Sequence, residues 1–151
     1  MDTFNRSHSD GTYWLMRAEH LAVVAVCSMV ALLHFRELNL WRFAAAFLVI
    51  DLAGYLPGLI AYLQTKKNSP QPRHIARGYH YLYNVMHSYL TWGVVVAVWW
   101  QCIGGQWEWA MLAVPIHLSG DRGVFGNVFK PVGRMFEPAK PDGTSNAVSG
   151  G

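Results

Sequence analysis

The chain of 151 residues is rich in apolar side chains and poor in charged ones, which argues against a soluble protein. Hydrophobic residues make up 52% of the sequence and charged residues 14%, whereas about 25% of the residues of an ordinary soluble domain are charged. The net charge of +3 does not indicate a nucleic-acid partner, because the basic residues are spread between apolar runs instead of gathered on one face. The two cysteines, Cys27 and Cys102, lack the spacing of a disulfide framework or a zinc knuckle.

Apolar runs predict an all-α fold, an integral membrane bundle of four transmembrane helices. A helix needs about 20 apolar residues to cross the hydrocarbon core of a bilayer. The second and third runs are long enough alone, whereas the first carries Glu19 and the fourth carries Glu108, groups that must lie near an interface or face the bundle. No cleavable signal is expected, since the first run starts late and lacks a cleavage pattern. The runs are Ala18 to Phe35, Leu38 to Gln64, Tyr79 to Cys102, and Gln106 to about Gly120.

The basic residues predict that both termini lie in the cytoplasm. With four spans, the N-terminal segment, the second connection and the C-terminal tail share one side of the membrane. That side holds ten of the twelve Lys and Arg residues, and Arg36 and Arg42 are the other two. The positive-inside rule places the more basic side in the cytoplasm. The ten residues are Arg6, Arg17, Lys66, Lys67, Arg73, Arg77, Arg122, Lys130, Arg134 and Lys140.

The sequence predicts one transmembrane domain over residues 1–137 and a disordered tail over residues 138–151. The length is that of one domain, and no Gly/Ser-rich or Pro-rich stretch divides the interior. After Asp121, apolar residues alternate with Arg122, Lys130 and Arg134, which suits a short interfacial segment at the cytoplasmic surface. The remainder, from Pro138 onward, has the composition of a disordered segment.

Ionisable residues inside the apolar runs are the candidates for chemistry. Asp51 lies near the middle of the second run, where a carboxylate costs at least ~2.5 to 3.5 kcal/mol unless it is paired or solvated. Pro57 with Gly54 and Gly58 allows a kink and a close helix approach, for which packing alone is the simpler interpretation. A polar stripe about 60° wide is expected along the third run, formed by His80, Asn84, His87 and Thr91.

The fourth run ends with His117 and Asp121 at i and i+4, a spacing from which both side chains can bind one metal ion. The four-span topology brings most of these groups into the cytoplasmic half of the bundle, with Glu19 and His20 at the start of the first helix. Each alone is also explained as a satisfied buried polar group, but such residues usually face a cavity or one another. We therefore predict a metal site for Zn, Fe or Mn, the Asp/His cluster of Asp51, His87, His117 and Asp121.

Arg122 directly follows Asp121. Its guanidinium could pair with a carboxylate or hold an anionic headgroup. Snorkelling toward the interface is an equally simple interpretation.

Four short motifs occur in order along the runs. They are Leu15-Met-Arg-Ala-Glu19, Ile50-Asp51-Leu-Ala-Gly-Tyr55, Tyr83-Asn84-Val-Met-His87-Ser88-Tyr89 and Ile116-His117-Leu-Ser-Gly-Asp121-Arg122. Their order resembles an uncharacterised family of small bacterial four-helix integral membrane proteins with L-R-x-E, D-x3-G-Y, Y-N-x2-H-S-Y and H-I-x2-D-R elements. The resemblance covers roughly Leu15 to Phe129 and implies architecture and a bacterial inner membrane, not a reaction. A looser likeness is to membrane-bound metal-dependent hydrolases, and it is analogy alone.

We expect a membrane enzyme that uses the Asp/His cluster on a membrane lipid or a lipophilic small molecule. With a divalent metal, a bound water would attack an ester or phosphoester, and Glu19 or His80 would act as general base or support the ligands. Without metal, Asp51 and its neighbours could run acid/base isomerisation or cyclisation. The alternatives are a haem-binding protein with His87 and His117 as axial ligands, and a non-enzymatic accessory or scaffold bundle. Assembly into homo-oligomers stays open.

Overall fold

The computed structural model describes residues 10–68, 74–132, 136 and 137, and these form helices and connections without a strand. The α-helices are α1 (Asp10–Leu33), α2 (Leu40–Gly54), α3 (Leu56–Asn68), α4 (Arg77–Met86), α5 (Tyr89–Cys102) and α6 (Ala113–Gly120). A 3-10 turn, η1 (Trp109–Leu112), precedes α6, and a π-helical turn, η2 (Asp121–Phe125), follows it. The all-α class is therefore confirmed.

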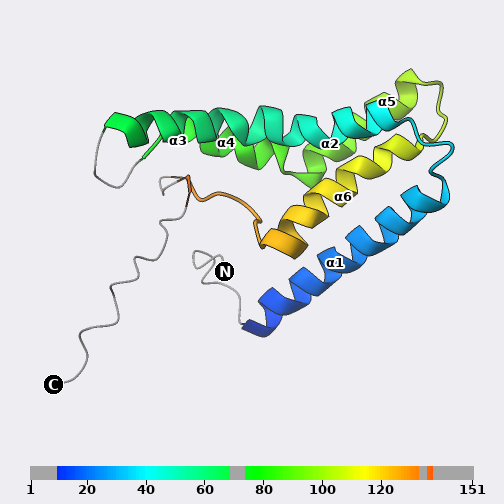
Figure 1. The fold of residues 1–151 in the computed structure, drawn as a ribbon, viewed down its shortest axis with the longest axis horizontal. Coiled ribbons are helices and arrows are strands. Elements are labelled where there is room, and N and C mark those ends of the chain that lie inside the picture. The colour runs from blue at the N-terminus through cyan, green and yellow to red at the C-terminus, as the bar shows by residue number, and fades with distance from the viewer. Residues whose placement is uncertain (1–9, 69–73, 133–135, 138–151) are drawn as a thin grey trace.

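The helices line up as four rods. The first is α1, the second is α2 with α3, the third is α4 with α5, and the fourth is η1, α6 and η2. Figure 1 shows α1 and α6 as a slanted pair, with α2 and α3 end to end beside them. The first rod packs on α6 and η2, and α2 packs on both α4 and α6. The fourth rod thus contacts both α1 and α2.

Two helical stretches are long and apolar enough to cross a membrane, Gly11–Leu33 and Leu40–Thr65. The second stretch passes through the junction of α2 and α3, because the Tyr55 N–H still donates to the Asp51 carbonyl at 2.9 Å. Large apolar side chains cover the outside of the rods; Trp41 is 88% and Leu90 80% exposed. So extensive an apolar surface is unusual for a soluble monomer and suits contact with lipid.

The first and fourth rods extend beyond the predicted runs. Helix α1 begins at Asp10, not Ala18, so Glu19 lies inside the helix and not at its start. Arg17 holds these added turns in place by donating to the carbonyls of Gly123 (2.9 Å) and Val124 (2.8 Å). The apolar pattern could not predict these added turns, because they are stabilised by a contact between residues far apart in the chain.

The third apolar run is two helices, which corrects the prediction of one continuous polar stripe. Helix α4 ends before His87, and Ser88 caps α5 by accepting a hydrogen bond from the Leu90 N–H at 3.2 Å. The indole of Trp92 donates to the Met86 carbonyl at 2.6 Å, which satisfies a group that the break leaves without its helical partner. Thr91 therefore belongs to a different helix from the other members of the stripe.

The residues after η2 fold back onto α3 and α4. The side-chain amide of Asn84 donates to the Lys130 carbonyl (3.0 Å), and its oxygen accepts from the Lys130 N–H (2.7 Å). Phe136 is buried against Gly58, where a Cβ would come within 2.3 Å of the ring. Lys130 and Phe136 are thus anchored on the helices, and the interfacial position of this segment stays a prediction. The predicted tail, residues 138–151, lies outside the described residues.

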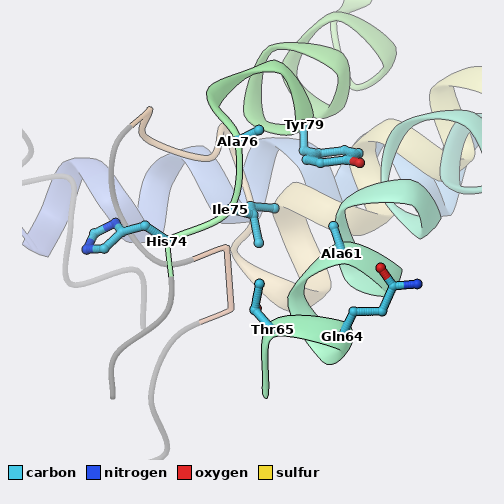
Figure 2. A pocket seen from close by; sticks show the side chains of 7 residues that line it. All are labelled: Ala61, Gln64, Thr65, His74, Ile75, Ala76 and Tyr79. Atoms are coloured by element: carbon cyan, nitrogen blue, oxygen red, sulfur yellow. The ribbon is translucent and has the colours of Figure 1, made fainter. Parts of the chain in front are cut away.

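A pocket of about 430 Å³ lies between the end of α3 and the start of α4 (Figure 2). Figure 2 shows Ile75 near its centre and His74 pointing away from the other side chains. None of the predicted site residues lines this pocket. Its lining residues are Ala61, Gln64, Thr65, His74, Ile75, Ala76 and Tyr79.

Candidate metal centre

The four members of the Asp/His cluster meet where α2, α4 and α6 approach one another. Asp51 comes from α2, His87 follows α4, His117 lies on α6 and Asp121 begins η2. One potential ligand atom from each residue lies within 4.8 Å of the others, a grouping that could hold a metal ion. Residues up to 70 positions apart in the chain are thus brought to one point by the packing of three helices.

Each imidazole of the cluster faces both carboxylates. The Nε2 atom of His87 lies 3.3 Å from Asp51 Oδ1 and 3.1 Å from Asp121 Oδ2. The Nε2 atom of His117 lies 3.7 Å and 3.8 Å from the same two oxygens. Metal–ligand bonds of about 2.0 to 2.2 Å in a tetrahedral site separate neighbouring ligand atoms by about 3.3 to 3.6 Å. The four nitrogen–oxygen distances of the cluster are close to this value.

The tautomer of His87 is fixed by the backbone of α4. Its Nδ1 atom lies 2.9 Å from the Tyr83 carbonyl oxygen, which can only accept, so Nδ1 carries a hydrogen. In a neutral ring the Nε2 lone pair then points toward Asp51 and Asp121. A lone pair facing two anionic oxygens is repelled unless a cation, either a metal ion or a proton, lies between them.

His117 is the least satisfied member of the cluster. It is buried, and among the described residues neither ring nitrogen has a hydrogen-bond partner. The ring of Phe47 packs edge-on against it at a centroid distance of 4.7 Å. An unpaired buried polar group is costly, and a cation bound by the lone pair of His117 Nε2 would remove that cost.

Gly54 permits the approach of α2 to His87. A Cβ at this position would lie 2.6 Å from Met86 Cβ and 3.2 Å from two atoms of the His87 ring. Any larger residue would push the end of α4 away from α2 and separate His87 from Asp51. The close packing that Gly54 was predicted to allow therefore also serves the cluster.

The π-helical turn η2 begins at the ligand Asp121. The Asp121 carbonyl accepts hydrogen bonds from the backbone N–H groups of Gly126 and Asn127. Single π-helical turns often occur at functional sites. No residue of the sequence signals this turn in advance, except Gly126, whose φ of 73° suits glycine at the end of a helix.

The cluster is closed on most sides and open at Asp51. The side chains of His87 and His117 are 3% and 4% exposed and that of Asp121 is 18% exposed, whereas the Asp51 side chain is 50% exposed. With neutral imidazoles the cluster carries two negative charges. A divalent cation would balance that charge and remain accessible from the side of Asp51.

Two other predicted catalytic residues, Glu19 and His80, are not members of this cluster. Glu19 lies on the exposed side of α1. His80 is buried two helical turns before His87, with its ring edge-on to Phe136 at a centroid distance of 5.5 Å. Their roles as general base or supporting residue stay predictions.

Tyr83 supports the cluster and was missed by the sequence reasoning. Its ring stacks on the His87 ring with centroids 3.8 Å apart, and its carbonyl accepts the His87 Nδ1 hydrogen. The spacing of four residues along one helix is the signal that could have identified it.

A second polar group lies at the opposite end of the rods, where the connections 34–39 and 103–108 meet; we call it the Trp109 end. Arg42 forms an ion pair with Glu108 at 2.9 Å. The indole of Trp109 donates to Glu37 at 2.9 Å, and the His34 ring stacks on the indole at 3.7 Å. The hydrogen bond from Trp109, helped by His34, lowers the pKa of Glu37 below its ordinary value.

Comparison of the chain with family models, curated protein sequences and solved structures gives no match. Function is therefore inferred from the side chains of this protein.

Proposed function

We propose that this protein is a multi-pass protein of a bacterial inner membrane, with four spans and both termini in the cytoplasm. The two long apolar stretches support membrane insertion, and the excess of Lys and Arg on one side supports the orientation. The broken third rod is compatible with a span, because Trp92 and Arg122 donate to the Met86 and His87 carbonyls at the break.

Within this bundle the Asp/His cluster binds one divalent metal ion, with Zn, Fe or Mn as the candidates. The observation that carries this proposal is the convergence of two imidazole Nε2 atoms on two carboxylate oxygens, with the His87 hydrogen held on Nδ1. The two negative charges of the cluster favour a dication over a single proton.

The geometry favours a metal ion over a haem. A haem bound by His87 and His117 would need a flat slot between the two rings. Both Nε2 atoms lie within 3.8 Å of carboxylate oxygens of Asp51 and Asp121. These carboxylates stand where the macrocycle would pass.

The reaction that this site supports best is hydrolysis of a lipophilic ester or phosphoester. A metal-bound water, made acidic by the ion, would attack the substrate from the open side of the cluster. Asp51 borders that side, and its carboxylate oxygen that does not hold the metal could accept a proton from the water. Leu48 and Leu52, its neighbours on α2, are exposed and apolar, so a membrane lipid or lipophilic small molecule could reach the site from the bilayer.

Metal analysis of the purified protein in detergent, together with an absorption spectrum, tests the proposal. We expect close to one metal ion per chain and no haem absorption. The variants His87→Gln and Asp121→Asn should lose the metal, whereas His34→Gln, at the Trp109 end, should keep it. Haem absorption, or a full metal content in both cluster variants, would contradict the assignment. Absence of both metal and haem from the wild type would leave metal-free acid/base chemistry or a scaffold role.

A further inference from the structure

Arg122 is a half-buried cation held beside two members of the Asp/His cluster. It follows Asp121 in the chain, and its Nη2 atom donates to the His87 carbonyl at 3.1 Å. Its guanidinium carbon lies 4.4 Å from the centroid of the Tyr89 ring and 5.5 Å from that of Phe129. A planar guanidinium stacked on an aromatic ring has a restricted orientation.

The aromatic platform under Arg122 is itself held in place. The hydroxyl of Tyr89 is hydrogen-bonded to Ser119, which is fully buried on α6. Arg122 is therefore fixed by both the third and the fourth rod. This arrangement differs from that of a side chain extending freely toward an interface.

Within the described part of the chain, Arg122 forms no ion pair with a carboxylate. Asp121, its neighbour in the chain, and Asp51 are both directed at the imidazoles of the cluster. Only one of its nitrogen atoms, Nη2, has a hydrogen-bond partner among the described residues. A cation inside a membrane protein usually meets an anion or marks the path of one.

The charge balance indicates what that anion is. A divalent ion would neutralise the two carboxylates of the Asp/His cluster, and among the described residues Arg122 would then have no carboxylate paired with it. Arg17 adds a second cation at η2, where it donates to the Gly123 and Val124 carbonyls and has no carboxylate partner among the described residues. The surroundings of the cluster thus favour an anionic ligand.

We propose that Arg122, together with the metal ion, binds a phosphoryl group, so that the lipophilic substrate is a phosphoester. This inference rests on the proposed metal site and names its substrate class. The forked N–H groups of arginine match phosphate oxygens. The same chemistry would recognise a phospholipid headgroup or a free phosphate.

Binding of inorganic phosphate and of phosphatidic acid to the full-length protein in uncharged detergent tests the inference. Calorimetry measures the first probe and native mass spectrometry the second, with metal content determined on each sample. Arg122→Gln should weaken phosphoryl binding about tenfold or more, the effect expected for loss of a charged hydrogen-bond donor, and should retain the metal. The phosphoryl affinity of Arg122→Lys should lie between those of the wild type and Arg122→Gln. Arg36→Gln, which removes the same charge from an exposed connection, should match the wild type.

The outcomes separate the inference from the metal proposal. Selective binding of phosphatidic acid identifies a lipid headgroup as the source, and equal binding of both probes identifies the phosphoryl group itself. Unchanged binding in Arg122→Gln, or no phosphoryl binding by metal-loaded wild type, overturns the inference. Binding that depends on Arg122 in a protein without metal would keep the anion site and reject the metal site. Thermal unfolding of each variant identifies any that fails to fold. If Arg122→Gln does not fold, Arg122→Lys is compared with the wild type in its place.

Discussion

The Trp109 end and the Asp/His cluster are both polar, and they differ in how their charges are balanced. At the Trp109 end, Arg42 is paired with Glu108, and Glu37 accepts the indole hydrogen of Trp109. In the Asp/His cluster, two carboxylates face two imidazoles and no Lys or Arg side chain of the described residues pairs with either carboxylate. The charges at the Trp109 end are balanced by protein side chains, whereas the negative charge and ligand spacing of the Asp/His cluster suit a bound cation.

The difference teaches that burial alone does not mark a functional group. Glu108 has a mostly buried side chain, yet its partner Arg42 explains it fully. His117 is also buried, but its Nε2 atom, 3.7 Å and 3.8 Å from two carboxylate oxygens, has no hydrogen-bond partner among the described residues. A buried nitrogen without a hydrogen bond, beside carboxylates without a Lys or Arg partner, is the stronger indication that the site binds a cation.

The largest expected effect is loss of metal from single-ligand variants. His87→Gln or His117→Gln should reduce the metal content of the purified protein to background, and the double variant should lose no more than either single one. The reason is that ligands of one centre act as a unit. Metal content measured by mass spectrometry checks this, with Arg42→Gln as the control that keeps the metal. Additive partial losses would indicate independent polar groups.

A chelator should distinguish a bound cation from a merely buried carboxylate. If Asp51 balances a metal ion, removal of the metal should lower the Tm of the wild type, because a ligand at 100 times its Kd stabilises the folded state by about 2.7 kcal/mol. Asp51→Asn should start at the lower Tm and show no response to the chelator. If no cation is bound, Asn at this position should be neutral or stabilising, and the Tm measurement would show it.

A smaller effect is expected at Gly54, where α2 packs closely against the end of α4 beside the cluster. Gly54→Ala should destabilise the protein by about 1 to 3 kcal/mol through overpacking and weaken metal binding, since its Cβ would meet Met86 and the His87 ring. Gly93→Ala is the matched control, because a Cβ there meets nothing within 4 Å. Unfolding in detergent and metal titration of both variants check the prediction. Equal behaviour of the two would show that α2 and α4 can separate without consequence.

The smallest effect is expected from Glu37 at the Trp109 end. Its pKa is lower in the folded protein than the ordinary value of 4.5, so its contribution to stability is present at higher pH and is lost as the pH falls through the folded pKa. Glu37→Gln should therefore lower the Tm slightly at pH 7, and the difference from the wild type should shrink below pH 4.5. A difference that stays constant over this range would mean that the charge of Glu37 is not involved.

The sequence was sufficient to predict the helical class and the four side chains of the Asp/His cluster. Apolar runs reveal helices, and ionisable residues stand out inside them, as Asp51 does. The break at His87 could not be predicted, because neither Gly nor Pro lies there and the carbonyls are satisfied by Trp92 and Arg122 from other turns and rods. The contact of His80 with Phe136 could not be predicted either, since Phe136 reaches the His80 ring only after the chain folds back.

The hydrogen bond from Arg122 to the His87 carbonyl has a consequence for biogenesis. During synthesis the third rod is made before the fourth, so this carbonyl has no donor from Arg122 until the last rod joins the bundle. Trp92, only six residues from Met86, can protect its own carbonyl at once. The cluster is thus assembled late, when His117, Asp121 and Arg122 arrive together. In a bundle that lacks the fourth rod, the His87 carbonyl of the third rod would lack its hydrogen bond from Arg122.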